Sequence, residues 1–116
     1  MRERGNMTKE IGVGIIGLGW MGQVHSRAYR RLFDHYPGCA LKPRLVMVAD
    51  AVEDRARESA ELLGYEGWTT DWREVVGHPE VEAVSIAAPN YLHKPVAVAA
   101  ARAGKHIWLE IMLVEL

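Results

Sequence analysis

The chain has 116 residues, a formal net charge of −1 and 49% apolar residues, values typical of one soluble globular domain. So small a charge gives no field to attract nucleic acid or an anionic membrane surface, so neither is an expected partner. No apolar run approaches the ~18 residues needed to span a bilayer. Cys39 is the single cysteine, which excludes an internal disulfide and favours a reducing, cytoplasmic location.

The start of the chain combines a polar segment with a glycine-rich turn. Residues 1–10 are polar and charged, so we expect a disordered arm there and a folded domain over residues 11–116. Residues 11–16 form an apolar run and residues 21–32 have helical spacing, with G-L-G-W-M-G between strand and helix. Strand, glycine turn and helix follow in the order that a dinucleotide site requires.

Each glycine of this turn has an expected role. Gly17 allows the tight turn, Gly19 lets the backbone approach a pyrophosphate, and Gly22 lets the helix pack close to the strand. The free N–H groups and the positive dipole end of the helix would then face the phosphates. Trp20 lies inside the turn, where it either covers the cofactor or is simply exposed.

Strands and helices alternate along the remainder of the chain. Residues 35–43 contain two prolines and a glycine, which predicts a loop. Gly64 is expected to end one helix, and Thr70 or Asp71 to cap the next, with Glu74 as the partner of Asp71 in a capping box. The pattern predicts further strands at residues 44–49, 68–69, 81–88 and 106–109, and further helices at residues 52–63, 71–76 and 92–103.

This alternation predicts an α/β fold, with a doubly wound parallel sheet of the Rossmann type. Right-handed crossovers leave few topologies, and the expected strand order is 3-2-1-4-5, without the sixth strand of the full sheet. Two strand ends then carry polar residues at the edge where a ligand binds. These are Asp50 after the second strand and Asn90 after the fourth.

Asp50 is the best candidate for a ribose ligand. An acid at the end of the second strand accepts hydrogen bonds from the ribose hydroxyls in this architecture. The alternative is that Asp50 merely caps the next helix; we favour the ribose role. An acid here repels a 2′-phosphate and so favours NAD over NADP, although Arg55 lies near enough to hold such a phosphate.

The other candidates are less decisive. Pro89 and Asn90 either contact the cofactor or only form a turn and helix cap, and spacing alone does not choose between these roles. His93 is more simply a surface residue of the helix. The five histidines and Cys39 show no metal-ligand spacing, and no serine has a nucleophile-elbow setting. Trp68, Trp72 and Trp108 are expected to pack in the core or at its edge.

Four segments together resemble the Gfo/Idh/MocA family of NAD(P)-dependent oxidoreductases. They are G-I-I-G-L-G-W-M-G-Q-V-H from Gly14, V-A-D from Val48, A-A-P-N-Y-L-H from Ala87 and A-G-K-H-I-W-L-E from Ala103. The resemblance implies an N-terminal Rossmann domain, followed in the family by a substrate-binding α/β domain. It also implies oxidation or reduction of sugars, inositols or related molecules, and it places His93 on the nicotinamide side. The expected cofactor-binding residues are Gly17, Gly19, Trp20, Met21, Gly22, Asp50, Ala88, Pro89, Asn90, His93 and Glu110.

The sequence departs from the family after its fifth strand. Family members continue into Glu-Lys-Pro, whose lysine helps to bind and polarise the reacting group. Here Glu110 is followed by Ile111 and Met112, and an isoleucine cannot exchange a proton. We expect these 116 residues to lack the family's C-terminal substrate domain. The expectation is therefore binding of NAD, with NADP as the alternative, and no catalytic residue.

Two further functions are open at this stage. One is a free-standing, non-catalytic nucleotide-binding or interaction module, because the tail I-W-L-E-I-M-L-V-E-L from Ile107 is strongly apolar and follows an edge strand. Such a tail is expected to mediate homo-oligomerisation. The other, less favoured, is an S-adenosylmethionine-binding domain, which shares a glycine-rich turn and an acid after its first two strands.

Overall fold

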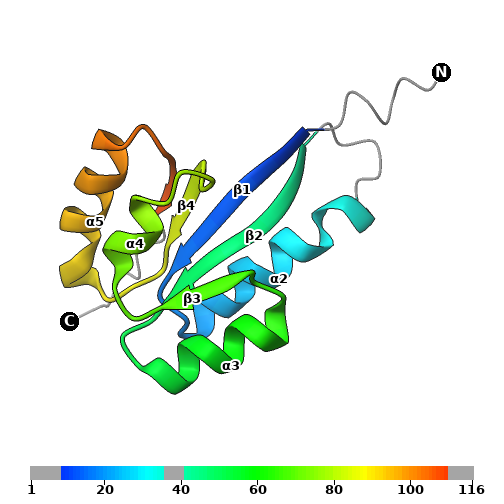
Figure 1. Cartoon of the computed structure of the whole chain (residues 1–116), viewed down its shortest axis with the longest axis horizontal. Helices are drawn as coiled ribbons and strands as arrows, with labels where there is room; N and C mark the ends of the chain where they lie inside the picture. The colour runs from blue at the N-terminus through cyan, green and yellow to red at the C-terminus, as the bar shows by residue number, and fades with distance from the viewer. Residues whose placement is uncertain (1–8, 36–40, 110–116) are drawn as a thin grey trace, which may run out of the picture.

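The computed structural model describes residues 9–35 and 41–109. It confirms the predicted Rossmann architecture, with a five-stranded parallel sheet in the order β3-β2-β1-β4-β5 (Figure 1). The strands are β1 (Lys9–Ile16), β2 (Leu41–Ala49), β3 (Gly67–Thr69), β4 (Ala83–Ile86) and β5 (His106–Leu109), and the helices are α2 (Trp20–His35), α3 (Glu53–Leu63), α4 (Trp72–Val76) and α5 (Asn90–Arg102).

The sheet extends further toward the amino end than predicted. Lys9 and Glu10 belong to β1 and pair with the first residues of β2, so they are strand residues and not part of an arm. Pro43 lies inside β2 and not in the preceding loop. There β2 is an edge strand, because β3 pairs only with residues 47–49, and an edge strand tolerates proline. Residues 1–8 of the predicted arm and 36–40 of the predicted loop lie outside the described residues.

The helix ends agree in most respects with the sequence signals. Gly64 follows α3 in the left-handed conformation, with φ of 89°. Asp71 caps α4 and accepts a hydrogen bond from the backbone N–H of Arg73 at 3.0 Å. Its own N–H donates to Thr69 Oγ1 at 3.0 Å, so this hydroxyl takes the place that the prediction gave to Glu74. α5 begins at Asn90, two residues earlier than predicted.

Apolar residues fill both faces of the sheet. Alternation along β1 places Val13 and Ile15 in the cluster under α2 and α3, and Ile16 in the cluster under α4 and α5 (Figure 1). At the sheet edge, Trp108 of β5 stacks on the buried His25 ring, with centroids 3.8 Å apart and planes within 8°. No helix within residues 9–35 and 41–109 has the length and apolarity to cross a membrane.

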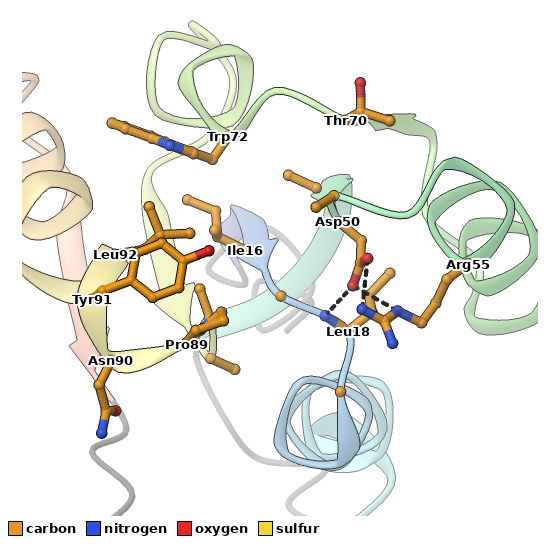
Figure 2. Close-up of a pocket in the computed structure, with 16 residues that line it drawn as sticks. Ile16, Leu18, Asp50, Arg55, Thr70, Trp72, Pro89, Asn90, Tyr91 and Leu92 are labelled. Atoms are coloured by element: carbon orange, nitrogen blue, oxygen red, sulfur yellow. Dashed lines mark hydrogen bonds and ion pairs between the residues drawn. The ribbon is translucent and has the colours of Figure 1, made fainter.

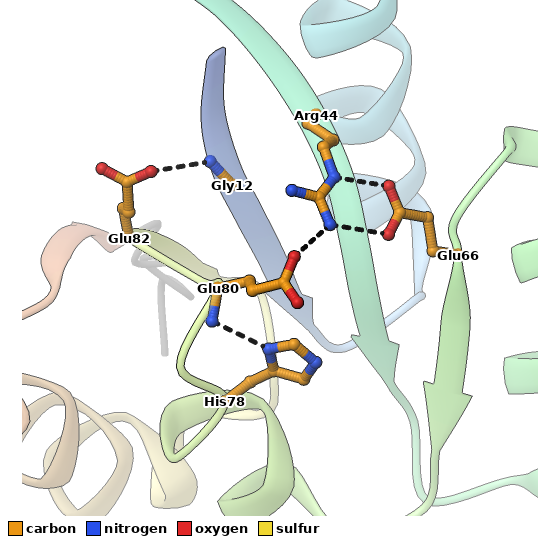
Figure 3. A network of polar contacts seen from close by, with 6 residues as sticks. All are labelled: Gly12, Arg44, Glu66, His78, Glu80 and Glu82. Carbon is orange, nitrogen blue, oxygen red and sulfur yellow. Dashed lines mark hydrogen bonds and ion pairs between the residues drawn. The ribbon is translucent and has the colours of Figure 1, made fainter.

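Charged side chains connect the segments that precede β3 and β4. Arg44 of β2 forms a bidentate pair with Glu66, with distances of 2.6 and 2.9 Å, and also contacts Glu80 (Figure 3). Nearby, Lys105 Nζ donates to the carbonyls of His78 and Val81 at 2.8 and 2.5 Å. These contacts lie at the amino ends of the strands. The turns that diverge from the sheet lie at the opposite, carboxyl ends.

Candidate nucleotide-binding site

A pocket of about 430 Å³ opens at the carboxyl ends of β1, β2, β3 and β4 (Figure 2). This is the crevice where ligands bind in open parallel sheets, because the chain leaves adjacent strands in opposite directions there. Sixteen residues line it: Ile16, Gly17, Leu18, Gly19, Ala49, Asp50, Ala51, Arg55, Thr70, Trp72, Ala87, Ala88, Pro89, Asn90, Tyr91 and Leu92.

The glycine turn forms the floor between β1 and α2. Gly17 has φ of 100°, a conformation that favours glycine, and its N–H donates to the carbonyl of Ala49 at 2.8 Å. A Cβ on Gly22 would lie 1.9 Å from the Gly17 carbonyl oxygen, so a side chain there would force α2 away from the turn. A Cβ on Gly19 would meet nothing within 4 Å, because it would project into open space beside the pocket.

Asp50 is the central charged residue of the site. The residue is only 5% exposed. One carboxylate oxygen accepts the N–H of Leu18 at 2.8 Å, and the other accepts the N–H of Val52 at 2.9 Å. The carboxylate therefore joins the glycine turn to the start of α3. The helix-cap alternative is wrong in detail, because the N-cap of α3 is Val52, and Asp50 orders the turn before it.

Arg55 completes the environment of this carboxylate from the first turn of α3. Its Nε and Nη2 atoms each lie 2.9 Å from a different oxygen of Asp50, which makes a bidentate ion pair (Figure 2). The Arg55 side chain is 48% exposed, whereas that of Asp50 is 2% exposed. The buried charge of Asp50 is thus compensated by a partner at the rim of the pocket.

The opposite wall is apolar and aromatic. Trp72 from the start of α4 faces Tyr91 and Leu92 from the start of α5, with Pro89 beneath them (Figure 2). The packing prediction for Trp72 was incomplete, because this side chain both packs against the core and lines the pocket. Sequence reasoning also missed Thr70 and Tyr91. Their position directly after β3 and β4 was the available signal.

His93 supports the pocket from behind. Its ring is buried, and Nε2 donates to the carbonyl of Ala88 at 2.8 Å. The family resemblance implied that His93 lies at the pocket. In the structure, His93 is not among the residues that line it. One helical turn into α5, the imidazole instead holds the β4–α5 turn, whose residues Ala88 and Pro89 do line the pocket.

The predicted site residues therefore fall into three groups. Those that line the pocket are Gly17, Gly19, Asp50, Ala88, Pro89 and Asn90. Met21, Gly22 and His93 lie in the supporting helices α2 and α5, and Trp20 is the first residue of α2. Glu110 and the side chain of Trp20 lie outside the described residues. Within the described ranges, no three His, Cys, Asp or Glu side chains are grouped to hold a metal ion.

The geometry fits a dinucleotide. The open space at Gly19 meets the first turn of α2, whose N–H groups suit phosphate oxygens. A buried carboxylate lies on one side of this turn and an apolar slot on the other. These three features correspond to the phosphates, a ribose diol and a flat base, respectively.

Comparison with known proteins decides the family. The sequence model of an oxidoreductase family with an NAD-binding Rossmann fold matches residues 11–111. The chain belongs to the Gfo/Idh/MocA family. The resemblance seen in the four sequence segments is thereby confirmed.

Individual relatives in the Gfo/Idh/MocA family agree with this assignment. Levoglucosan dehydrogenase of Pseudarthrobacter phenanthrenivorans is 44% identical over 88% of this chain and 26% of the relative. The scyllo-inositol 2-dehydrogenase (NAD(+)) of Bacillus subtilis is 34% identical over 90% of this chain and 28% of the relative. A solved structure of levoglucosan dehydrogenase in complex with NADH superimposes with a TM-score of 0.83 at 40% identity, over 86% of this chain and 27% of that one.

The chain thus spans about a quarter of the length of the curated Gfo/Idh/MocA relatives that it matches. The matched quarter is the NAD-binding Rossmann domain of dehydrogenases named for levoglucosan and inositols. The family's lysine position, occupied here by Ile111, lies outside the described residues.

Proposed function

We propose that this chain binds NAD in the pocket at the carboxyl end of its sheet, with NADP as the alternative cofactor. The proposed role is that of the nucleotide-holding part of a dehydrogenase acting on a hydroxyl or carbonyl of a sugar or inositol. The observation that carries the proposal is the convergence of the glycine turn and the buried Asp50 on one pocket. The named activities of the relatives support the substrate class.

Each part of the pocket has a proposed task. Gly17, Gly19 and the first turn of α2 bind the pyrophosphate through backbone N–H groups. Trp20 and Met21 belong to that turn, and Gly22 keeps it close to β1.

Asp50 accepts hydrogen bonds from the adenosine ribose. Pro89 and Asn90 border the nicotinamide side, and His93 fixes their turn through Ala88. Glu110 is the last proposed cofactor contact.

The bound cofactor supplies hydride transfer, whereas this chain's residues bind and orient it. Among the described residues, the ionisable groups that line the pocket are Asp50, Arg55 and Tyr91, and the first two are bound to each other. The ion pair occupies Asp50 and Arg55, and the remaining group, the phenol of Tyr91, is 78% exposed at the surface, where water is not excluded. We therefore propose binding without turnover for the chain by itself.

Calorimetric titration with NADH tests the cofactor proposal. We expect saturable binding, which weakens about tenfold in Asp50→Asn because a charged hydrogen-bond acceptor is lost. Asp54→Asn is the matched control, since Asp54 lies close by in the first turn of α3, has a 74% exposed side chain and does not line the pocket. No saturable binding of NADH or NADPH, or equal effects of the two substitutions, would contradict the proposal.

A spectrophotometric assay tests the absence of turnover. The chain is mixed with NAD and either levoglucosan or myo-inositol, and the absorbance of NADH is followed. We expect none to form, and steady formation above a chain-free control would show that the chain is catalytic by itself. A thermal-shift comparison of NADH with S-adenosylmethionine separates the proposed function from the methyltransferase alternative.

Two other predictions remain part of the proposal. Ile107 and Trp108 are 39% and 44% exposed on the edge strand β5, which supports self-association. The tail residues 110–116 lie outside the described residues, and light scattering of the purified chain is the measurement that decides. A cytoplasmic location is proposed from the single cysteine, Cys39, and cell fractionation tests it.

A further inference from the structure

A chain of hydrogen bonds connects α2 with the segment that joins α3 to β3. The hydroxyl of Tyr65 lies 2.7 Å from Ser26 Oγ, and Ser26 Oγ donates to the carbonyl oxygen of Gly22 at 2.8 Å. Ser26 is fully buried and Tyr65 is 7% exposed. A serine hydroxyl has one proton, and a carbonyl can only accept, so Tyr65 must donate to Ser26. The chain of donors therefore runs from Tyr65 through Ser26 to Gly22.

Tyr65 is held in place by elements other than α2. Its N–H donates to the carbonyl of Ala60 in the last turn of α3 at 2.9 Å, and the next N–H, of Glu66, donates to the carbonyl of Leu45 in β2 at 3.0 Å. Burial raises the pKa of Tyr65, although its hydrogen bond with Ser26 lowers it, so the phenol stays protonated and remains a donor near neutral pH. The hydroxyl is thus a fixed point against which α2 is placed.

The carbonyl at the other end of this chain belongs to the first turn of α2. The helix begins at Trp20, and helix geometry leaves the N–H groups of Trp20, Met21 and Gly22 without a carbonyl partner inside the helix. These are the N–H groups proposed to bind the pyrophosphate, and hydrogen bonds weaken steeply when donor and acceptor are misaligned. A serine hydroxyl bound to the carbonyl four residues earlier can bend a helix, so Ser26 acts on the direction of this turn.

We propose that Tyr65 and Ser26 are positioning residues for cofactor binding, which set the direction of the first turn of α2 and so aim its N–H groups at the pyrophosphate. This inference rests on the proposed cofactor function and deepens it with two residues that do not line the pocket. Tyr65 acts through Ser26, and Ser26 acts through the Gly22 carbonyl. If the chain only stabilised the fold, its loss would lower the unfolding temperature but leave the environment of the bound phosphates unchanged.

The substitution Tyr65→Phe tests this proposal, because it removes the donor and keeps the buried ring. In calorimetric titrations, we expect the affinity for NADH to fall up to about fivefold, since one neutral hydrogen bond that orients the turn is lost. At saturating NADH, we expect the phosphorus NMR resonances of the bound cofactor to move from their wild-type positions. The second measurement reports on the phosphates themselves, which a purely structural role would not affect.

Tyr29→Phe is the matched control. Tyr29 also has a partly buried hydroxyl, but it lies two turns beyond Gly22 on α2 and forms its hydrogen bond with Ser85 of β4. We expect this variant to keep the wild-type NADH affinity and phosphorus spectrum. The double variant of Ser26→Ala and Tyr65→Phe completes a cycle with the two single variants. Its effect on NADH affinity should be smaller than the product of the single effects, because both changes break the same chain.

Thermal unfolding measures the stability of every variant separately from binding. If Ser26→Ala does not fold, the comparison of Tyr65→Phe with Tyr29→Phe decides the question by itself. If wild type binds neither NADH nor NADPH, the proposed function fails and this inference fails with it.

Other outcomes would overturn the inference alone. It fails if wild type binds NADH and Tyr65→Phe keeps both the wild-type affinity and the wild-type phosphorus spectrum, whatever happens to its stability. It also fails if Tyr29→Phe has equally large effects, or if Tyr65→Phe weakens binding by the same factor with and without the Ser26 hydroxyl. Weaker NADH binding and shifted phosphorus resonances in Tyr65→Phe, absent from Tyr29→Phe, confirm it.

Discussion

Two single substitutions in the glycine turn test folding and cofactor binding separately. We expect Gly22→Ala to lower the stability of the fold and Gly19→Ala to weaken NADH binding. In Gly22→Ala, the new Cβ would lie 1.9 Å from the Gly17 carbonyl oxygen and 2.9 Å from its carbon. To reach an ordinary contact of 3.4 Å, the two groups must move apart by about 1.5 Å. Neither backbone moves easily, because Gly17 is hydrogen-bonded to Ala49 and Gly22 lies in the first turn of α2.

The size of the effect follows from opposing contributions. Overpacking against backbone costs about 1–3 kcal/mol, and alanine recovers up to about 1 kcal/mol of helix propensity. The severe overlap at Gly22 places its cost at the upper end, so we expect a net loss of about 2 kcal/mol. In Gly19→Ala nothing lies within 4 Å and φ is not positive, so we expect unchanged stability or a gain of up to about 1 kcal/mol from the stiffer unfolded chain.

Urea unfolding followed by circular dichroism measures both variants, and NADH titration completes the comparison. We expect Gly22→Ala to unfold at lower urea than wild type. Gly19→Ala should fold normally but bind NADH weakly, because its methyl group occupies the approach to the turn. Equal stability of Gly22→Ala and wild type would refute the close contact between helix and turn. A destabilised Gly19→Ala would refute the open space at that position.

Two further predictions concern the pH dependence of stability. Hydrogen bonds from Arg44 lower the pKa of Glu66 below its ordinary 4.5, so its stabilising effect is complete above that value and is lost as the pH falls through the lowered pKa. The difference in unfolding free energy between wild type and Glu66→Gln should shrink in acid urea titrations, and a constant difference would contradict this. Burial raises the pKa of Tyr65, despite its hydrogen bond with Ser26. Its contribution is therefore complete below the ordinary 10.0 and is lost as the pH rises through the raised pKa. Tyr65→Phe should unfold with less dependence on pH above about 10, and an equally steep alkaline loss would count against the buried phenol.

Local signals predicted most of the scaffold because each depends on a few neighbouring residues. The apolar run before Gly17 and the left-handed glycine at position 64 lie where the sequence placed them, and of the two caps it offered, Thr70 and Asp71, the structure has Asp71. The strand order followed from the right-handed crossover rule. Element ends were less predictable: β1 gains Lys9 and Glu10 because β2 pairs with them, and that pairing is not encoded in their own residue types.

The candidate site shows the same division. Gly17, Gly19 and Asp50 were predictable, because a tight turn and a strand-end acid have local sequence signatures. Trp72 was predicted only as a packing residue, because nothing near it in sequence indicates that α4 begins opposite α5. His93 was placed at the pocket by resemblance, whereas its ring is directed to the carbonyl of Ala88.

The sequence by itself determined that a strand, a glycine turn and a helix create a phosphate-binding corner, with an acid at the next strand end. These features depend on backbone conformation and on alternation of side chains over short distances. Only the tertiary structure decided how that acid is occupied. Asp50 binds the N–H of Leu18, 32 positions earlier in the chain, and shares its remaining capacity with Arg55. The contact with Leu18 arises where separate turns meet at one edge of the sheet, so no local pattern announces it.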